Sequence, residues 1–181
     1  MIEDKLLIWR FKSGSSDALS RIYGKYKNNL LKITSGLLND TAAAEDIVHD
    51  CFVSLAQSPE KLRLNGNLKS YLATCVANRA RNANLARQRC ETPGLNDADP
   101  TVSKSKRPEQ WIIESDQLRE LNNALGRIPY EQREVIILHL HGGMKFKTIA
   151  ESQNVSINTV QSRYRYGLEK LRSILDSEAE L

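Results

Sequence analysis

The chain has 181 residues, 40% of them hydrophobic and 27% charged, which suffices for one soluble domain of ordinary size or for two small ones. Its formal net charge of +4 favours a polyanionic partner only weakly. The distribution of charge along the chain is therefore needed to show whether the protein has such a partner. It has no stretch of about 18 apolar residues and begins with acidic residues, which argues against a membrane span and a secretory signal peptide.

The first part of the chain predicts two helices. Residues 6–11 start a short one, and the run from Ser15 to Asp17 supplies capping groups for a longer one. The apolar residues of this longer helix recur at i, i+3, i+4 and i+7 and are Leu19, Ile22, Tyr23, Tyr26, Leu30, Ile33 and Leu37. Because this spacing places them on one face, they are expected to line a core.

Two further helices complete a predicted N-terminal module. Asn39 and Asp40 break the long helix and cap the next one, which Pro59 ends. The buried face of that next helix is predicted to consist of Ala44, Ile47, Val48, Cys51, Phe52 and Leu55. A polar loop at residues 62–67 then leads into a helix that starts at Leu68 and has Leu72, Cys75 and Val76 facing inward.

The composition changes after residue 90. Residues 91–108 contain three prolines, one glycine and several Asp, Ser and Lys residues, with Leu95 and Val102 as the only sizeable aliphatic side chains. Burial cannot offset the ordering entropy of such a stretch, so an extended linker is predicted. The sequence therefore predicts an all-α fold, in which a linker at residues 91–110 joins two small helical modules at residues 1–90 and 111–181.

A helix-turn-helix is predicted in the C-terminal module. Residues 147–153 form its short first helix and residues 157–175 its longer second helix. Between them, Asn154 tolerates the left-handed backbone conformation and Ser156 is suited to cap the second helix. The inward stripe of the second helix is predicted to be Val160, Tyr164, Leu168 and Leu171.

The outward face of this second helix suits DNA. Residues 158–172 carry four basic groups and one acidic group, whereas residues 111–181 as a whole carry nine basic and ten acidic groups. Its N-terminal half is crowded with side chains that can bond base edges and phosphates. The candidate DNA-binding residues are Asn158, Thr159, Gln161, Ser162, Arg163, Arg165 and Tyr166. A solvated amphipathic helix is the alternative, and the preceding turn favours the DNA-binding interpretation.

The N-terminal module has two surfaces of opposite charge. Residues 68–89 contain no acid, three interleaved asparagines and five basic residues, namely Lys69, Arg79, Arg81, Arg87 and Arg89. The preceding helix instead exposes a stripe at helical spacing that contains Asp46, His49 and Asp50, with Glu45 beside it. Taken alone, a run of charged residues is as consistent with a face that only contacts water as it is with a binding surface. Together, the two surfaces favour a protein that contacts nucleic acid on one side and a basic protein on the other.

Short motifs in both halves point to one family. In the N-terminal half they are Asp17-Ala18-Leu19 with Tyr23 and Tyr26, Ala44-Glu45-Asp46-Ile47-Val48-His49-Asp50-Cys51-Phe52, and Leu68-Lys69-Ser70-Tyr71-Leu72 with Ala77-Asn78-Arg79. In the C-terminal half they are Leu125-Gly126-Arg127-Ile128-Pro129, Gln132-Arg133-Glu134-Val135, Ile149-Ala150-Glu151, and Ser156 with Thr159-Val160-Gln161-Ser162-Arg163. With these motifs in this order, the chain resembles the extracytoplasmic-function (ECF) class of bacterial RNA polymerase sigma factors over nearly its whole length.

The resemblance implies a role for each surface in promoter-specific transcription initiation. The residues that would bind core RNA polymerase are Glu45, Asp46, His49 and Asp50. Those that would capture the minus-ten promoter element are Asn65, Asn67, Lys69, Ser70, Tyr71, Asn78, Arg79, Arg81 and Asn82. The helix from Asn158 would read the minus-thirty-five element in the major groove. The resemblance also leads us to expect an anti-sigma factor as a further partner, and no cofactor.

Two other classes of protein are alternatives to this interpretation. A helix-turn-helix repressor or activator would use the N-terminal half for dimerisation or ligand binding, and would bind a palindromic site without polymerase. An enzyme is disfavoured because His49, His139 and His141 form no metal-ligand spacing with the cysteines and no nucleophile motif is present. His139 and His141 are expected at a helix end.

The cysteines point to a reducing environment. Cys51, Cys75 and Cys90 are odd in number and form no C-x-x-C pair, which argues against a disulfide framework and a zinc site. A cytoplasmic location is therefore expected. Nothing in the sequence links the three residues to redox sensing, since a buried cysteine is usually inert.

Overall fold

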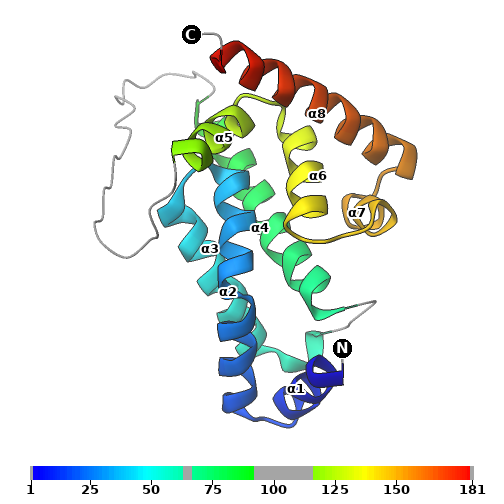
Figure 1. Ribbon diagram of the computed structural model, residues 1–181. Helices are drawn as coiled ribbons and strands as arrows, with labels where there is room; N and C mark the ends of the chain where they lie inside the picture. Colours follow the sequence, from blue (N-terminus) through cyan, green and yellow to red (C-terminus); the bar gives the residue numbers. More distant parts are fainter. Residues whose placement is uncertain (1, 63–66, 92–115, 180–181) are drawn as a thin grey trace.

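The computed structural model describes residues 2–62, 67–91 and 116–179. Within these ranges the chain forms eight α-helices and one turn of 3-10 helix, with no β-strand, so the all-α prediction is confirmed (Figure 1). In chain order the elements are α1 (Ile2–Lys12), α2 (Ser16–Leu38), α3 (Thr41–Gln57), η1 (Pro59–Lys61), α4 (Leu68–Glu91), α5 (Asp116–Gly126), α6 (Tyr130–Leu140), α7 (Phe146–Gln153) and α8 (Ile157–Ala179). The predicted linker at 91–110 lies outside the described residues except for Glu91.

The helix boundaries in the N-terminal half follow the predicted capping groups. The Ser15 side chain caps α2 by accepting a hydrogen bond from the Ala18 N–H at 3.4 Å. Asn39 ends α2 in the left-handed conformation, with φ +54°, and Asp40 caps α3 by accepting from the Ala43 N–H at 3.1 Å. Asn tolerates this conformation better than most residues, so the chain reverses direction here within two residues.

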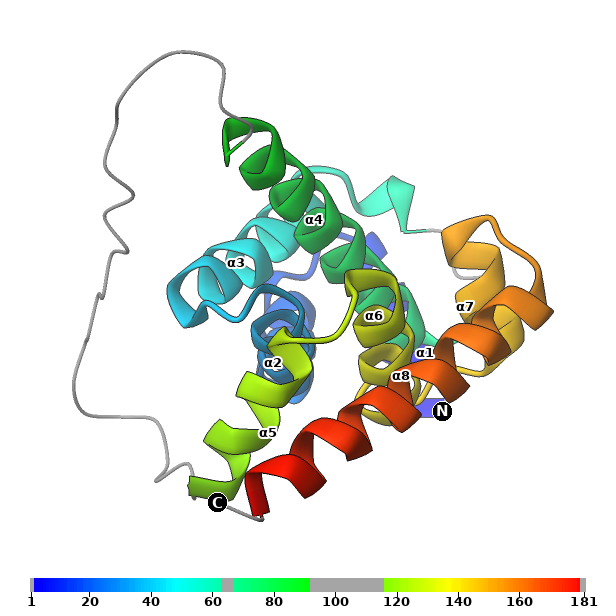
Figure 2. The same cartoon turned by 90° about the horizontal axis from the view of Figure 1, so that it is seen from above.

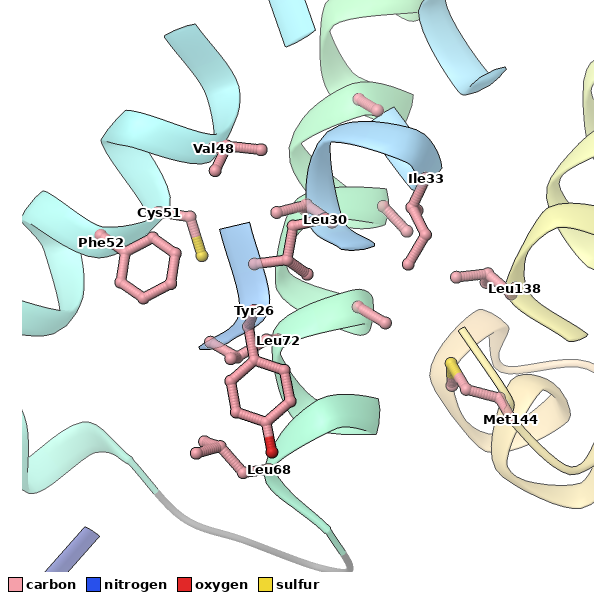
Figure 3. Close-up of a cluster of buried hydrophobic side chains, with 14 of the residues drawn as sticks. Tyr26, Leu30, Ile33, Val48, Cys51, Phe52, Leu68, Leu72, Leu138 and Met144 are labelled. Atoms are coloured by element: carbon pink, nitrogen blue, oxygen red, sulfur yellow. The ribbon is translucent and has the colours of Figure 1, made fainter. Parts of the chain in front are cut away.

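Helix α2 is the centre of the N-terminal module. It packs against α1, α3 and α4, and the predicted stripe along it is largely buried (Figure 1). The core around α2 contains Tyr26, Leu30, Ile33, Val48, Phe52, Leu68 and Leu72 (Figure 3). On the outer side, Asp4 ties α1 to α2 by accepting hydrogen bonds from Lys25 at 2.8 Å and from the Tyr26 hydroxyl at 2.9 Å.

In the C-terminal module, α8 crosses α6 at a glycine rather than at a leucine. Leu168, predicted to face inward, is 36% exposed, whereas Gly167 is buried. A Cβ atom at Gly167 would lie 2.8 Å from Ile136 Cδ1 and 3.1 Å from Gln132 Cβ, so only glycine allows this approach. The prediction for Leu168 was therefore wrong, because the approach of α6 shifts the buried stripe by one residue.

The two modules pack against each other through α6. Viewed from above, α6 lies between α2 and α8 (Figure 2). Its residues Ile137 and Leu138 belong to the same buried cluster as Leu30 and Ile33 of α2. Asn29 adds a hydrogen bond across the contact, because its amide donates to the His141 carbonyl at 3.0 Å. None of the helices in the described ranges is both long and apolar enough to cross a membrane.

Two glycines of α2 provide a test of this contact. A Cβ at Gly24 would meet nothing within 4 Å, whereas a Cβ at Gly36 would lie 2.8 Å from Cδ1 of the buried Ile137. Gly24→Ala is expected to raise the free energy of unfolding by about 1 kcal/mol through helix propensity. Gly36→Ala should lose that gain, because overpacking of a core costs about 1–3 kcal/mol. Denaturant unfolding followed by circular dichroism measures both, and equal stabilisation would contradict the contact.

Candidate nucleic-acid interface

Helices α7 and α8 form the predicted helix-turn-helix. Asn154 takes the left-handed conformation, with φ +53°, and ends α7. The Val155 N–H donates back to the Ala150 carbonyl at 3.1 Å, which tightens the turn. The Ser156 hydroxyl then caps α8 by accepting from the Thr159 N–H at 3.1 Å. The predicted turn and cap are both confirmed, and they direct the N-terminus of α8 outward (Figure 2).

The candidate DNA-binding residues on α8 are arranged as the sequence predicts. Four of them are exposed, namely Asn158, Gln161, Arg165 and Tyr166, and the other three are partly exposed, namely Thr159, Ser162 and Arg163. The Arg165 guanidinium lies over the Tyr166 ring, 4.8 Å from its centroid. Arg163 is held differently, because its Nη1 donates to Gln153 Oε1 at 3.0 Å. This bond ties α8 to the last residue of α7.

An aromatic cluster supports the helix-turn-helix from behind. The ring of His139 on α6 stacks on Phe146, with centroids 4.4 Å apart, and both rings lie 5.1 Å from Tyr164 on α8. His139 Nδ1 is also 2.8 Å from the Met144 carbonyl oxygen. His139 is in the last turn of α6, as expected, but it also joins three helices. No local sequence signal indicates that role.

The candidate minus-ten residues lie along α4, at its N-terminus and on one side of its middle. Asn67 is exposed and caps the helix, because its Oδ1 accepts from the Ser70 N–H at 2.7 Å. Of the remaining candidates, Asn78 and Asn82 are exposed, whereas Lys69, Tyr71 and Arg79 are partly exposed. Asn65 lies outside the described residues.

The basic surface expected on α4 is partly neutralised. Arg87 donates to Asp40 Oδ2 at 2.7 Å. The Ala43 backbone N–H and this arginine hold the pKa of Asp40 below its ordinary value. One of the five predicted basic residues therefore ties α4 to the start of α3 within the N-terminal module, instead of offering an unpaired charge to DNA.

Arg81, another of these five, contacts the C-terminal module. Its Nη2 and Nε donate to the two oxygens of Glu134 on α6 at 2.5 and 3.4 Å, and its Nη1 donates to Asn78 at 3.0 Å. The Glu134 side chain is only 3% exposed, against 31% for Arg81. Burial raises the pKa of Glu134, and the charges of Arg81 and Arg163 oppose that rise. Glu134 is not among the residues predicted to bind DNA or polymerase, because only the packing of α4 against α6 reveals its partner.

A cleft between the modules brings the two candidate DNA-binding surfaces together. It has a volume of about 250 Å³ and is lined by α4, by α6 and by the helix-turn-helix. The lining residues include Arg81 from α4, Glu134 from α6, and Gln153 and Arg163 from the helix-turn-helix. In this arrangement, an arginine from each candidate surface faces the same acid.

The acidic stripe on α3 is exposed as predicted. Glu45, Asp46, His49 and Asp50 are all exposed, and none has an ion-pair partner among the described residues. This surface is on the side of α3 that faces away from α2, because Val48 and Phe52 fill the opposite side (Figure 3). In the described part of the chain, no three His, Cys, Asp or Glu residues are grouped closely enough to hold a metal ion.

Comparison with known families assigns both modules. Residues 22–90 match the family model of sigma-70 region 2, and residues 118–171 match that of sigma-70 region 4. The chain is 27% identical to the RNA polymerase sigma factor CarQ of Myxococcus xanthus over 95% of this chain and 97% of that protein. It is 24% identical to the ECF RNA polymerase sigma factor SigW of Bacillus subtilis over 94% and 96% of the two chains.

Solved structures share the fold. CnrH, in complex with the cytosolic domain of CnrY, superposes with a TM-score of 0.66 at 19% identity, covering 97% of this chain and 98% of that one. The sigma factor RpoE, in complex with the anti-sigma factor NepR from Bartonella quintana, gives 0.67 at 22% identity, covering 87% and 96%. The family matches account for both modules in the predicted order. The chain therefore belongs to the ECF class of sigma factors, which direct promoter-specific transcription initiation.

Proposed function

We propose that this chain directs core RNA polymerase to promoters by dividing the task among three surfaces. The acidic stripe on α3 binds the polymerase, α4 with the segment before it contacts the minus-ten element, and α8 reads the minus-thirty-five element. The observation that carries the proposal is the helix-turn-helix. Its turn presents the N-terminal half of α8, with four exposed candidate residues, to solvent.

Helix α8 suits the major groove for two reasons. Its N-terminal N–H groups and helix dipole favour a phosphate, which positions the helix on the backbone. Gln161 and Arg163, which lie in the second turn of α8, then provide the bidentate groups that distinguish base edges. The aromatic cluster of His139, Phe146 and Tyr164 keeps this helix at a fixed angle to α6.

Helix α4 suits unpaired bases. Tyr71 provides a partly exposed ring on which a base can stack, and Asn78 and Asn82 provide amides one and two turns beyond Cys75. Lys69 adds a positive charge near the N-terminus of the helix, where a phosphate is favoured. The side chains of this surface hold bases after strand separation, while the polymerase carries out nucleotide addition. We assign no catalytic step to this chain, and place it in the cytoplasm with the polymerase.

Promoter binding requires the two modules to separate. Arg81 and Arg163 both line the cleft that contains Glu134, and Arg81 is bonded to that acid, so the closed cleft restricts the approach of DNA to both arginines. We propose that polymerase binding opens the modules. A protein that stabilises the closed arrangement would act as an anti-sigma factor, and two similar structures are complexes, of CnrH with the cytosolic domain of CnrY and of RpoE with the anti-sigma factor NepR.

Transcription in a purified system tests the proposal. Core polymerase alone should not initiate from the cognate promoter, and addition of this chain should produce a transcript with a defined start site. A repressor or activator would instead bind a palindromic duplex as a dimer without polymerase. Tight binding to DNA by the free chain, with no initiation on any promoter of a genomic library, would overturn the proposal.

Arg163→Ala is expected to weaken recognition of the minus-thirty-five element. Loss of a bidentate contact to a base costs about 1–3 kcal/mol, or roughly 5- to 150-fold in affinity. The measurement is holoenzyme binding to promoters with and without the upstream element. Arg172→Ala is the matched control, since Arg172 is 85% exposed and lies more than two turns further along α8. Equal effects of the two substitutions would contradict the role assigned to Arg163.

A further inference from the structure

Gln153, the last residue of α7, contacts the arginine of α8 that is proposed to read DNA. Its Oε1 accepts a hydrogen bond from Arg163 Nη1 at 3.0 Å. The same side chain lines the cleft that contains Glu134, and its Nε2 is buried with no hydrogen-bond partner among the described residues. Gln153 is not one of the residues predicted from the sequence to bind DNA or polymerase, so this contact calls for an explanation.

The contact with Arg163 fixes the orientation of the Gln153 amide. A guanidinium group has only donors, so the amide oxygen has to face it, and the reverse orientation would place two donors together. This orientation leaves Nε2 without an acceptor in the cleft, and an unpaired buried donor lowers stability. The arrangement therefore adds little net stability to the fold, and its main effect is on the position of Arg163.

The backbone is fixed on both sides of this contact. Asn154, in the left-handed conformation with φ +53°, ends α7 directly after Gln153. On α8, Val160 is fully buried one turn before Arg163, and Tyr164 beside that arginine packs in the aromatic cluster. Because neither helix end is free to move, the hydrogen bond restricts the rotamers of the arginine. The entropy of ordering this long side chain is then already lost before DNA binds.

The hydrogen bond leaves one edge of the Arg163 guanidinium for DNA. Gln153 uses Nη1, and in the described part of the chain Nε and Nη2 of Arg163 have no hydrogen-bond partner. These two nitrogens together suit a planar group with two acceptors, and Arg81 uses the same pair to bond both oxygens of Glu134. In the major groove, O6 and N7 of guanine are such a pair of acceptors.

We propose that Gln153 is a positioning residue for base recognition, which holds Arg163 so that its Nε and Nη2 bond O6 and N7 of a guanine in the minus-thirty-five element. This inference rests on the proposed function, because it requires α8 to read that element. Both residues belong to the helix-turn-helix, so their contact does not depend on the closed cleft. Gln153 thereby increases the preference for guanine over other bases, more than the general attraction to phosphates.

Base discrimination by the holoenzyme tests this role. Core polymerase with the full chain is bound to a promoter with the complete upstream element, and to promoters in which each base pair of that element is replaced in turn. Arg163→Ala identifies the base pair that this arginine reads, which we expect to contain guanine. Gln153→Met keeps the length of the side chain and removes the acceptor. It should lower the preference at that base pair by roughly 2- to 12-fold, the effect of one hydrogen bond, and leave the other pairs unchanged.

Gln153→Glu separates positioning from a structural role. A carboxylate also accepts from Arg163 Nη1, so this variant should retain the preference for guanine that Gln153→Met loses. Its negative charge near DNA should weaken binding to all the promoters alike, most strongly at low salt. A residue that only supported the fold would not divide the two variants in this way. Circular dichroism confirms that each variant is folded.

The double variant Arg163→Ala/Gln153→Met completes the test. If Gln153 acts through Arg163, its substitution should have no further effect on the preference once the arginine is absent. Four results would contradict this role: Gln153→Met leaves the preference unchanged, it weakens binding to every promoter equally, its effect adds independently to that of Arg163→Ala, or the base pair that Arg163 reads lacks guanine. In each case Arg163→Ala still changes the preference at one base pair, so the proposed function stands. If Arg163→Ala changes it at none, the reading of DNA by Arg163 and the role of Gln153 are both wrong.

Discussion

Arg81→Ala is expected to open the contact between the two modules at neutral pH. Glu134 is 3% exposed, and Arg81 is its only ion-pair partner among the described residues. Removal of one partner from a buried ion pair costs about 3–5 kcal/mol, because the remaining charge is left without compensation in a poorly solvated site. The modules can avoid this cost by separating, which exposes Glu134 to water. Small-angle X-ray scattering should detect the change as an increase in the radius of gyration.

The pH dependence of this opening follows from the pKa of Glu134, which burial raises above its ordinary value. The closed form thus binds the proton of Glu134 more tightly than the open form does, and closure becomes more favourable as pH falls. Arg81→Ala removes a charge that lowers this pKa, so the variant should close below the ordinary carboxyl pKa of 4.5 and open as pH rises through the raised value.

A second substitution serves as the control for Arg81→Ala. Glu134→Gln keeps the shape of the side chain and removes the charge, so the Arg81→Ala/Glu134→Gln double variant should be more closed at neutral pH than Arg81→Ala alone. It should also lose the pH dependence. A compact Arg81→Ala protein at neutral pH, with the same radius of gyration as the unaltered chain, would show that the ion pair does not hold the modules together.

Asp46→Lys is expected to weaken binding to core polymerase by about 2–3 kcal/mol, or roughly 30- to 150-fold in the dissociation constant. Asp46 is exposed in the middle of the acidic stripe on α3, and a reversed charge there repels a basic partner surface. Folding should not change, because the side chain contributes nothing to the buried cluster around Val48 and Phe52. Fluorescence anisotropy of the labelled protein with purified core polymerase measures the affinity.

Glu60→Lys is the matched control for Asp46→Lys. It makes the same change in net charge on the same module, at an exposed residue of η1 that lies outside the acidic stripe. We expect its affinity for polymerase to stay within about threefold of that of the unaltered chain, because a change of an exposed charge outside the centre of an interface has a small effect on affinity. If the two variants lose affinity equally, general electrostatic attraction is responsible rather than docking of the α3 stripe.

The features that were predicted well depend on residues close together in the chain. Asp40 and Ser156 cap helices through hydrogen bonds to backbone N–H groups three residues away, and Asn39 and Asn154 take the left-handed conformation that their short amide side chains tolerate. These hydrogen bonds and backbone conformations involve only residues within one helical turn of each other. The helices, the helix-turn-helix and the exposed polar half of α8 could therefore be predicted without knowledge of the packing.

The features that were missed depend on contacts between distant residues. The buried stripe of α8 includes Gly167 instead of Leu168, because Ile136 of α6 approaches the helix at that point. Helical periodicity gives the side of a helix that is apolar, but not the place where another helix comes closest. Glu134 was missed for the same reason, since its partner Arg81 is 53 residues away.

The sequence by itself determined where most of the helices lie, how several of them are capped, and that a helix-turn-helix stands near the C-terminus, because caps, turns and apolar spacing act over a few residues. Tertiary structure alone decided that α6 packs on α2 and that Arg81 and Arg163 share the cleft with Glu134. These pairings depend on how apolar faces are buried against each other, and many distant pairs of residues fit the same local pattern. The helix-turn-helix was therefore predictable, whereas the contacts that close it against α4 were not.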